Sequence, residues 1–343
     1  MTQSRSPTRE VVAPVAPSGR QAPDDAIGSA AAAWTRRHVL DLDDFTADEI
    51  ETVLATARTM KEILARDVPR APALRGTTIV TLFYEASTRT RASFELAGKV
   101  LGADVINLTA SGSSIEKGES LIDTVRTLQA IGANILVMRH PMSGAPYLAA
   151  RWCDAQVINA GDGWHAHPTQ GLLDLYTLQQ GLGELRGKRV VIVGDVAHSR
   201  VARSDIWGLT TMGAEVVVCG PPTLLPAELG QPHAAGLPAV TVETNLDRAL
   251  AGADAVMALR LQHERMESGL LPSIREYCRL YQITEERMAL ARPGAPVLHP
   301  GPMNEGVEIS DGLAHGSRSL VEEQVSNGVA IRMGLLYLMG RSR

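Results

Sequence analysis

Short apolar runs rich in β-branched residues alternate with stretches of helical periodicity along most of the chain. These runs occupy residues 77–83, 104–108, 134–138 and 155–159 in the first half, and residues 189–195, 215–219, 253–259 and 295–298 in the second. Strands buried on both faces are unbroken apolar runs, and strands that alternate with helices form parallel sheets. The 343 residues are therefore predicted to form two doubly wound α/β domains, each with a central parallel sheet flanked by helices.

Polar residues follow the first run, where a parallel sheet is expected to bind its ligands. Residues 87–91 read Ser-Thr-Arg-Thr-Arg, and Phe94, Ala97 and Leu101 continue at helical spacing. A helix that starts here presents unpaired backbone N–H groups and the positive end of its dipole, and an arginine adds a planar fork for phosphate oxygens. The segment is thus a candidate phosphate site. The alternative is that Ser87 only caps the helix and that both arginines are solvated.

The sequence gives little support to nucleotide, dinucleotide or metal binding. It contains no Gly-x-x-x-x-Gly-Lys-Ser/Thr loop and no Gly-x-Gly-x-x-Gly fingerprint, and Gly194 stands alone after the fifth run. His165 and His167 have the spacing of two residues on one side of a strand, but no third ligand is well placed for a metal. We therefore expect no cofactor and no metal.

Composition and charge favour a globular protein of the cytoplasm. The chain is 45% hydrophobic and 21% charged, and its net charge of −5 argues against a nucleic-acid surface. Its three cysteines are far apart and lack Cys-x-x-Cys pairing, as expected in a reducing compartment. No stretch is long and apolar enough for a membrane span or a signal peptide. Residues 1–33 show no periodicity and are predicted to be a disordered leader, with a partner-binding tail as the alternative.

Two amphipathic helices are predicted near the ends of the ordered chain. The first covers residues 46–65, where Thr46 and Glu49 have the spacing of a capping box. The second covers residues 320–339, and its apolar face is predicted to consist of Val321, Val325, Val329, Met333 and Leu336.

Two motifs of the first half resemble the transcarbamoylase family. Residues 87–91 after a Phe-x-Glu strand end are similar to its carbamoyl-phosphate loop, and residues 167–170, His-Pro-Thr-Gln, match its signature. The resemblance covers about residues 38–341 and implies an active site in the cleft between a domain of residues 34–172 plus 320–343 and a domain of residues 173–319. The residues that it implies for carbamoyl phosphate are Ser87, Thr88, Arg89, Thr90, Arg139, His167, Gln170, Pro300 and Gly301. Those that it implies for catalysis are Arg89, Thr90, Arg139, His167 and Lys117.

Motifs of the second half resemble the aspartate-binding members of this family. The Arg-x-Gln string at 260–262 and the His-Pro-x-Pro string at 299–302 are similar to theirs, whereas ornithine-type members carry His-Cys-Leu-Pro at the latter position. The residues that this implies for L-aspartate are Lys117, Arg200, Arg260, Gln262, Gly301 and Pro302. The implied reaction transfers the carbamoyl group of carbamoyl phosphate to L-aspartate, the committed step of de novo pyrimidine biosynthesis. The alternatives are transfer to ornithine or another amino acid, and a non-catalytic assembly subunit.

The resemblance also implies an active site shared between subunits. The small, polar loop at 110–120 matches a lid that brings Ser113 and Lys117 into the site of a neighbouring subunit, so the expected assembly is a homotrimer. A larger assembly with regulatory subunits or a dihydroorotase is left open, and neither nucleic acid nor a membrane is expected as a partner. Glu85 is expected to pair with Arg200 or Arg265 when the domains close. Glu305 departs from the family, which often has Arg there, and this puts a local ion pair in doubt.

Overall fold

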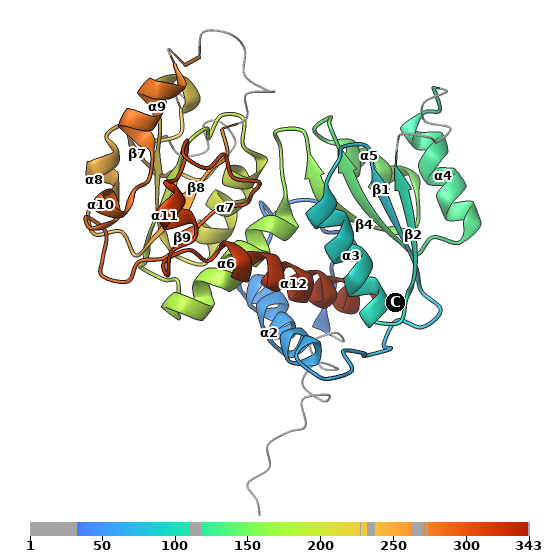
Figure 1. Cartoon of the computed structure of the whole chain (residues 1–343). Coiled ribbons are helices and arrows are strands. Elements are labelled where there is room, and N and C mark those ends of the chain that lie inside the picture. Colours follow the sequence, from blue (N-terminus) through green and yellow to red (C-terminus); the bar gives the residue numbers. More distant parts are fainter. Residues whose placement is uncertain are drawn as a thin grey trace, which may run out of the picture.

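A computed structural model describes residues 33–109, 118–226, 228–231, 237–261, 270–271 and 273–341. The predicted leader, the lid residues Ser113 and Lys117, and Gln262 and Arg265 therefore lie outside the described residues, apart from residue 33. The described part of the chain contains two separate parallel sheets, each with helices on both faces, as predicted (Figure 1).

The first sheet has the strand order β2-β1-β3-β4, and all of its pairs are parallel. Its strands are β1 (Thr78–Phe83), β2 (Asp104–Thr109), β3 (Ile135–His140) and β4 (Gln156–Asp162). The helices that follow these strands are α3 (Thr88–Val100), α4 (Leu121–Ile131), α5 (Ala145–Trp152) and α6 (Pro168–Leu182). Strands β3 and β4 extend beyond the predicted runs, so Arg139 belongs to the end of a strand and not to a loop.

The second sheet has the order β7-β6-β5-β8-β9, again with parallel pairs. Its strands are β5 (Arg189–Val193), β6 (Glu215–Cys219), β7 (Thr241–Glu243), β8 (Ala255–Ala258) and β9 (Val297–Leu298). Its helices are α7 (Arg200–Thr211), η2 (Pro222–Leu224), α8 (Leu246–Leu250), α9 (Ile274–Tyr281), α10 (Glu285–Met288) and α11 (Asp311–Ala314). Strand β7 was not predicted, because this three-residue edge strand has two exposed residues and lacks an apolar run.

The two terminal helices confirm one prediction and correct another. Helix α2 (Ala47–Leu64) begins with the predicted capping box, in which the Glu49 N–H donates to Thr46 Oγ1 and the Thr46 N–H donates to the Glu49 carboxylate. Helix α12 (Val321–Arg341) packs on α2, α3 and α6, which lie beside the first sheet. The prediction for its buried face was wrong at Val325, which is 49% exposed. Polar side chains such as Gln324 and Asn327 are buried instead, because α6 supplies their hydrogen-bond partners.

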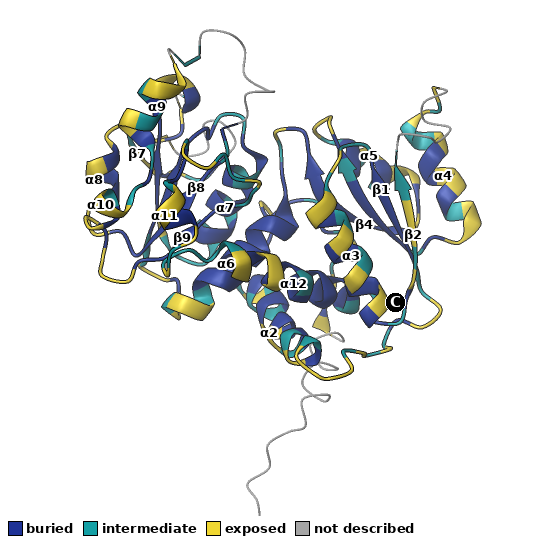
Figure 2. Ribbon diagram, in the orientation of Figure 1, coloured by how far each residue is buried: buried dark blue, intermediate teal, exposed yellow. Residues whose placement is uncertain are grey.

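The core consists of three apolar clusters, and the largest joins the two sheets. It runs from α2, α3 and one face of the first sheet through α6, α7 and α12 to one face of the second sheet. The other faces are covered by α4 and α5 in the first sheet, and by helices including α8 and α9 in the second. Buried residues accordingly line the strands other than the edge strands β2 and β7, and much of the central helices (Figure 2). None of the described helices is long and apolar enough to cross a membrane.

Candidate active site

Helix α3 starts directly after β1, at the carboxyl end of the first sheet. Ser87 precedes its first turn, and the described part of the chain shows no hydrogen bond from this side chain to the helix backbone. The interpretation of Ser87 as a simple cap is therefore not supported. Thr90 is 7% exposed, and the Arg91 N–H donates to the Ser87 carbonyl. The N–H groups before this first helical bond have no partner within the helix and remain open to an anion.

A carboxylate links the two halves of the site. The Glu85 Oε2 atom lies 2.8 Å from Arg200 Nη2 at the start of α7 and 3.3 Å from Arg139 Nε at the end of β3. The Glu85 side chain is 19% exposed and that of Arg200 only 5%. The structure thus shows the interdomain pair that was expected of Glu85 with Arg200. Arg200 also donates to the Gly163 carbonyl at 3.3 Å, so the guanidinium is held on both sides.

His167 lies next to these arginines and is neutral. It is 4% exposed, its backbone N–H donates to Ser204 Oγ on α7, and it precedes the first turn of α6. Burial, together with nearby arginines including Arg139 and Arg200, holds the pKa of His167 well below its usual value. A neutral imidazole has one N–H donor and one acceptor nitrogen. It suits a hydrogen bond to a carbonyl oxygen.

Gly161 explains how His167 and Arg200 come together. Its φ of +114° is one that side-chain-bearing residues rarely adopt. A Cβ atom there would lie 3.0 Å from Arg200 Cζ and 3.3 Å from His167 Cδ2. The backbone of β4 is therefore bare at the point where both side chains pack on it.

Arg89 reaches across to the loop that follows β9. Its guanidinium lies against Gly301, where a Cβ atom would be only 2.5 Å from Arg89 Cζ. His299, in the same loop, accepts a hydrogen bond from the Gly301 N–H through Nδ1 at 2.8 Å. Burial, together with the positive charges of Arg89 and Arg260, lowers the pKa of His299 to about 3. Residues 299–301, Arg89 and Arg260 thus share one positively charged region.

A buried glutamate fixes the segment that carries Arg260. The Glu308 carboxylate accepts hydrogen bonds from the Leu261 N–H at 2.9 Å and from both the backbone and the side chain of Asn304, at 3.1 and 2.9 Å. Burial raises the pKa of Glu308. Sequence reasoning assigned no role to the side chains of Glu308 or His299, although His299 begins the recognised motif at 299–302 and Glu308 follows it closely. Glu305 lies 3.4 Å from the exposed side chain of His315.

Some of the remaining predicted site residues lie in the described part of the chain, and the others lie outside it. Gln170 is 8% exposed in the first turn of α6, and its amide donates to Asp174 one turn later. Pro300 and Pro302 flank Gly301 in the loop beside Arg89. Ser113, Lys117 and Gln262 lie outside the described residues, so the structure does not place them.

His165 lies between two carboxylates. Its Nδ1 lies 3.2 Å from Asp162 and its Nε2 lies 3.4 Å from Asp41, and the hydrogen bond with Asp162 raises the pKa of His165. Among the residues that the structure describes, no group of three or more His, Cys, Asp or Glu side chains is placed to hold a metal ion.

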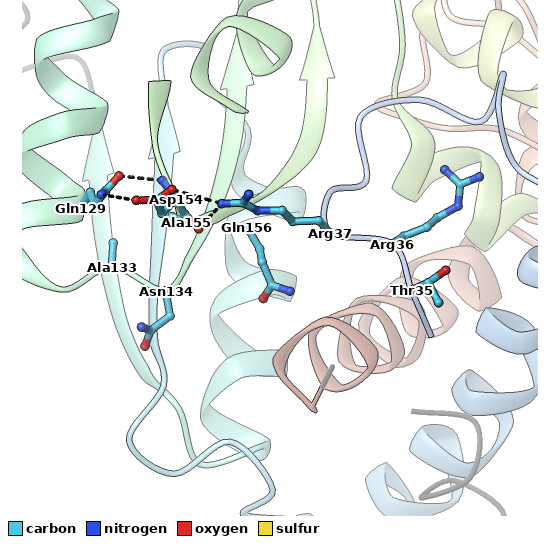
Figure 3. A pocket seen from close by; sticks show the side chains of 9 residues that line it. All are labelled: Thr35, Arg36, Arg37, Gln129, Ala133, Asn134, Asp154, Ala155 and Gln156. Carbon is cyan, nitrogen blue, oxygen red and sulfur yellow. Dashed lines mark hydrogen bonds and ion pairs between the residues drawn. The ribbon is translucent and has the colours of Figure 1, made fainter. Parts of the chain in front are cut away.

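A surface cavity of about 500 Å³ lies elsewhere (Figure 3). It borders the segments that lead into β3 and β4, at the amino ends of these strands, whereas ligands of parallel sheets gather at the carboxyl ends. Several of its polar groups pair with one another, since Arg37 donates to the Asp154 carbonyl at 2.9 Å and Gln129 exchanges hydrogen bonds with Asp154. None of the described candidate site residues lines it. We therefore do not assign the chemistry to this cavity.

Comparison with family models identifies both halves of the chain. Residues 37–180 match the carbamoyl-phosphate-binding domain of the aspartate/ornithine carbamoyltransferases, and residues 186–339 match their aspartate/ornithine-binding domain. The chain belongs to the aspartate/ornithine carbamoyltransferase family. Its two parallel-sheet domains are those of the transcarbamoylase fold, as the resemblance implied.

Two curated relatives carry the same name. The aspartate carbamoyltransferase catalytic subunit of Roseiflexus sp. (strain RS-1) is 62% identical over 302 residues, which are 88% of this chain and 94% of the relative. That of Dehalococcoides mccartyi (strain CBDB1) is 56% identical over 310 residues, which are 90% of this chain and 93% of the relative.

Solved structures resemble the chain over nearly its whole described length. Aspartate transcarbamoylase from Trypanosoma cruzi in complex with carbamoyl phosphate and aspartate is 29% identical, with a TM-score of 0.79 over 90% of this chain and 98% of that chain. Ornithine carbamoyltransferase from Pyrococcus furiosus is 28% identical, with a TM-score of 0.78 over 88% and 96% of the two chains. The fold alone therefore does not separate the two acceptors, and the identity to curated relatives does.

Proposed function

We propose that the protein is an aspartate carbamoyltransferase catalytic chain, which converts carbamoyl phosphate and L-aspartate into N-carbamoyl-L-aspartate and phosphate. One observation carries the proposal. The helix start at Ser87–Thr90 in the first domain meets Arg200 and the loop at 299–302 of the second domain, through the Glu85–Arg200 pair and the Arg89–Gly301 contact. The names of relatives that are 56–62% identical support the same activity.

Carbamoyl phosphate binds where positive groups converge. Its phosphate lies at the start of α3, held by the open N–H groups and by the side chains of Ser87, Thr88, Arg89, Thr90 and Arg139. Its amino group needs hydrogen-bond acceptors, which Gln170 and the Pro300 carbonyl supply. Its carbonyl oxygen accepts a hydrogen bond from neutral His167, with Thr90 and Arg139 as further donors. Gly301 permits the approach of Arg89.

L-Aspartate binds on the side of the second domain. Arg200 and Arg260 hold its two carboxylates, and Gln262 and the neighbouring subunit's Lys117 lie beside them. Two of the five Arg200 N–H groups are engaged, one by Glu85 and one by the Gly163 carbonyl, so the guanidinium keeps donors for a carboxylate. The backbone around Gly301 and Pro302 faces the aspartate amine.

The reaction needs little covalent help from the protein. The aspartate amine attacks the carbonyl carbon, the bond from this carbon to the phosphate oxygen breaks, and the departing phosphate accepts the proton of the amine. The chain contributes position and hydrogen-bond donors for the oxygen on which negative charge develops. No metal or cofactor takes part.

The acceptor is tested directly by supplying carbamoyl phosphate with L-aspartate or with L-ornithine. We expect N-carbamoyl-L-aspartate as the only product. If citrulline forms, the assignment of the phosphate site stands, but the proposed roles of Arg260 and Gln262 are refuted. A pure, assembled protein that forms neither product would favour the non-catalytic assembly subunit.

The active site is shared between subunits of a homotrimer in the cytoplasm, and Ser113 and Lys117 come from the neighbour. The domain of residues 34–172 is completed by residues 320–343, because α12 packs on α2 and α3, and residues 173–319 form the second domain. Three free cysteines support a reducing compartment. The molar mass in solution tests the trimer, and a monomer with full activity would refute the shared site. Regulatory subunits or a dihydroorotase remain candidate partners.

A further inference from the structure

Buried polar side chains meet where three helices pack between the two domains. Asp174 lies on α6, Asp205 on α7, and Gln324 and Arg332 on α12. Each of these residues is at most 4% exposed. Helix α6 packs on both α7 and α12, in the middle of the molecule in Figure 1. Such groups are costly to bury unless each finds a partner, so their contacts identify what holds them there.

The Asp174 carboxylate accepts hydrogen bonds from two glutamine side chains. Gln170 Nε2 lies 3.1 Å from both of its oxygens, and Gln324 Nε2 lies 2.6 Å from Oδ1. The positive charge of Arg332 further stabilises the anion. An ionised carboxylate only accepts hydrogen bonds, so each amide must turn its NH2 group towards Asp174. Each amide oxygen is thereby directed elsewhere.

Asp205, next to Asp174, holds its proton more strongly, because the pKa of Asp174 is raised to about 7 and that of Asp205 well above its usual value. The two carboxyl groups are in contact, and burial raises the pKa of both. Apart from Asp174, neither oxygen of Asp205 has a hydrogen-bond partner among the residues that the structure describes. Two adjacent buried carboxylates cannot both be charged, and the amides and Arg332 favour charge on Asp174. Asp205 therefore carries the proton and donates it in a hydrogen bond to Asp174.

The oxygens of the two glutamine amides are connected with the two hydrogen-bond acceptors that were assigned above to the carbamoyl amino group. Gln324 Oε1 accepts the backbone N–H of His299 at 2.9 Å, and His299 leads directly into Pro300. Gln170 Oε1, turned away from Asp174, is the acceptor assigned above to the carbamoyl amino group. One carboxylate therefore sets the position of an acceptor in the first domain and, through Gln324, of the Pro300 carbonyl in the second.

We propose that Asp174 is a positioning residue that orients both acceptors for the carbamoyl NH2 group, directly through Gln170 and indirectly through Gln324 and His299. The inference rests on the proposed function, because it requires carbamoyl phosphate as the ligand of Gln170. It predicts that replacing Asp174 lowers the affinity for carbamoyl phosphate only through contacts with the carbamoyl end of this substrate. Inorganic phosphate lacks this end and reports only on the phosphate site.

The test compares carbamoyl phosphate with inorganic phosphate in the Asp174→Asn protein. Asparagine replaces one of the two carboxylate oxygens by an NH2 group, so Gln170, whose Nε2 lies 3.1 Å from both oxygens, then faces a donor as well as an acceptor and its orientation is no longer fixed. We expect the Kd of carbamoyl phosphate to rise about tenfold or more, as for a lost polar partner, and the Kd of inorganic phosphate to stay within about twofold. If the Kd values of both ligands rise equally, or if neither rises, the inference is overturned, because a merely structural role of Asp174 would not distinguish carbamoyl phosphate from inorganic phosphate.

Asp205→Asn is the matched control. Its Nδ2–H group replaces the O–H donor to Asp174 at nearly the same size, so both Kd values should stay within about twofold of wild type. A selective loss in Asp205→Asn as large as that in Asp174→Asn would contradict the assigned proton position. If Asp174→Asn does not fold, Gln324→Met removes the indirect connection from Asp174 to His299, with both of its hydrogen bonds, and leaves Gln170 and Asp174 in place. This variant should bind carbamoyl phosphate more weakly than wild type and inorganic phosphate equally well. If it affects both ligands to the same extent, the connection through Gln324 to His299 is refuted.

Gln170→Ala separates this inference from the proposed function. If Gln170→Ala leaves the Kd of carbamoyl phosphate unchanged, the assignment of Gln170 to the substrate fails. If Gln170→Ala weakens binding but Asp174→Asn does not, only the positioning role fails. We expect both variants to weaken binding, and the effect of Asp174→Asn to be smaller in the Gln170→Ala background, since the two changes affect the same hydrogen bond.

Discussion

Replacing Gly301 by alanine should damage the phosphate site while leaving the fold intact. The new Cβ atom would lie 2.5 Å from Arg89 Cζ and closer still to both terminal nitrogens of the guanidinium. These atoms end a long side chain that is free to rotate, so the clash is relieved by displacing Arg89. The φ of +58° adds strain of about 1–2 kcal/mol for a residue with a Cβ atom.

Gly306 provides a matched control in the same loop. It has a similar φ of +77°, and the nearest described atom to its Cβ position, Asp311 Oδ1, is 3.9 Å away. Gly306→Ala therefore carries the backbone strain without displacing an arginine. The difference between the two variants isolates the contribution of Arg89.

The expected magnitude follows from the lost contact. A hydrogen bond to a charged group contributes about 1.5–3 kcal/mol, which corresponds to roughly a 10- to 150-fold rise in the Kd of carbamoyl phosphate. Calorimetric titration of Gly301→Ala and Gly306→Ala, with urea unfolding of both, measures affinity and stability together. We expect similar unfolding free energies and a clear difference in Kd. Equal Kd values would show that Arg89 does not bind the phosphate.

Four further experiments test other parts of the site. Arg139→Ala should lose about 2.7–4 kcal/mol of transition-state stabilisation, as for an oxyanion donor, and a loss below tenfold in kcat would place Arg139 outside the site. Glu85→Ala leaves two arginines without their shared carboxylate, so aspartate KM or kcat should worsen about tenfold; unchanged values would make the interdomain pair irrelevant. Inactive Lys117→Ala and Arg89→Ala trimers should regain activity when mixed and reassembled, and hybrids that stay inactive would argue against shared sites. His299, whose pKa is about 3 when folded and about 6.5 when unfolded, binds more protons in the unfolded state, so it destabilises the fold as pH falls from 6.5 towards 3. His299→Gln should reduce this pH dependence by up to about 1.4 kcal/mol per pH unit in urea unfolding at pH 5–7, and an identical slope would refute it.

The sequence predicted what depends on neighbours along the chain. The strand runs and the capping box of Thr46 and Glu49 follow from local propensity and spacing, and the structure confirms them. Strand ends were less accurate, because pairing of β3 with β4 carries both strands past their apolar runs. Strand β7 exists because β6 offers an edge, which its own three residues do not reveal.

The face of α12 could not be inferred from its own residues. Helical periodicity alone predicted that the valines at 321, 325 and 329 belong to the buried face. The helix packs on α2, α3 and α6 at the same time, so it is buried around much of its circumference. Gln324 and Asn327 are tolerated inside because Asp174 and Thr177, about 150 residues earlier, complete their hydrogen bonds. A polar residue in a buried helix is predictable only when its partner is known.

The Asp174 network shows how a buried polar residue can be explained by the hydrogen bonds that it makes. In the sequence, Asp174 interrupts an apolar helix whose residues from Pro168 to Leu178 are all buried. A helix that is apolar all round belongs in a core, so a carboxylate within it costs free energy that packing does not return. A neutral amide would cost less but offers a donor as well as an acceptor, and so would leave the orientation of its partners undetermined. Only an acceptor without donors forces two amides into one orientation, and the role that we propose for Asp174 requires such an acceptor.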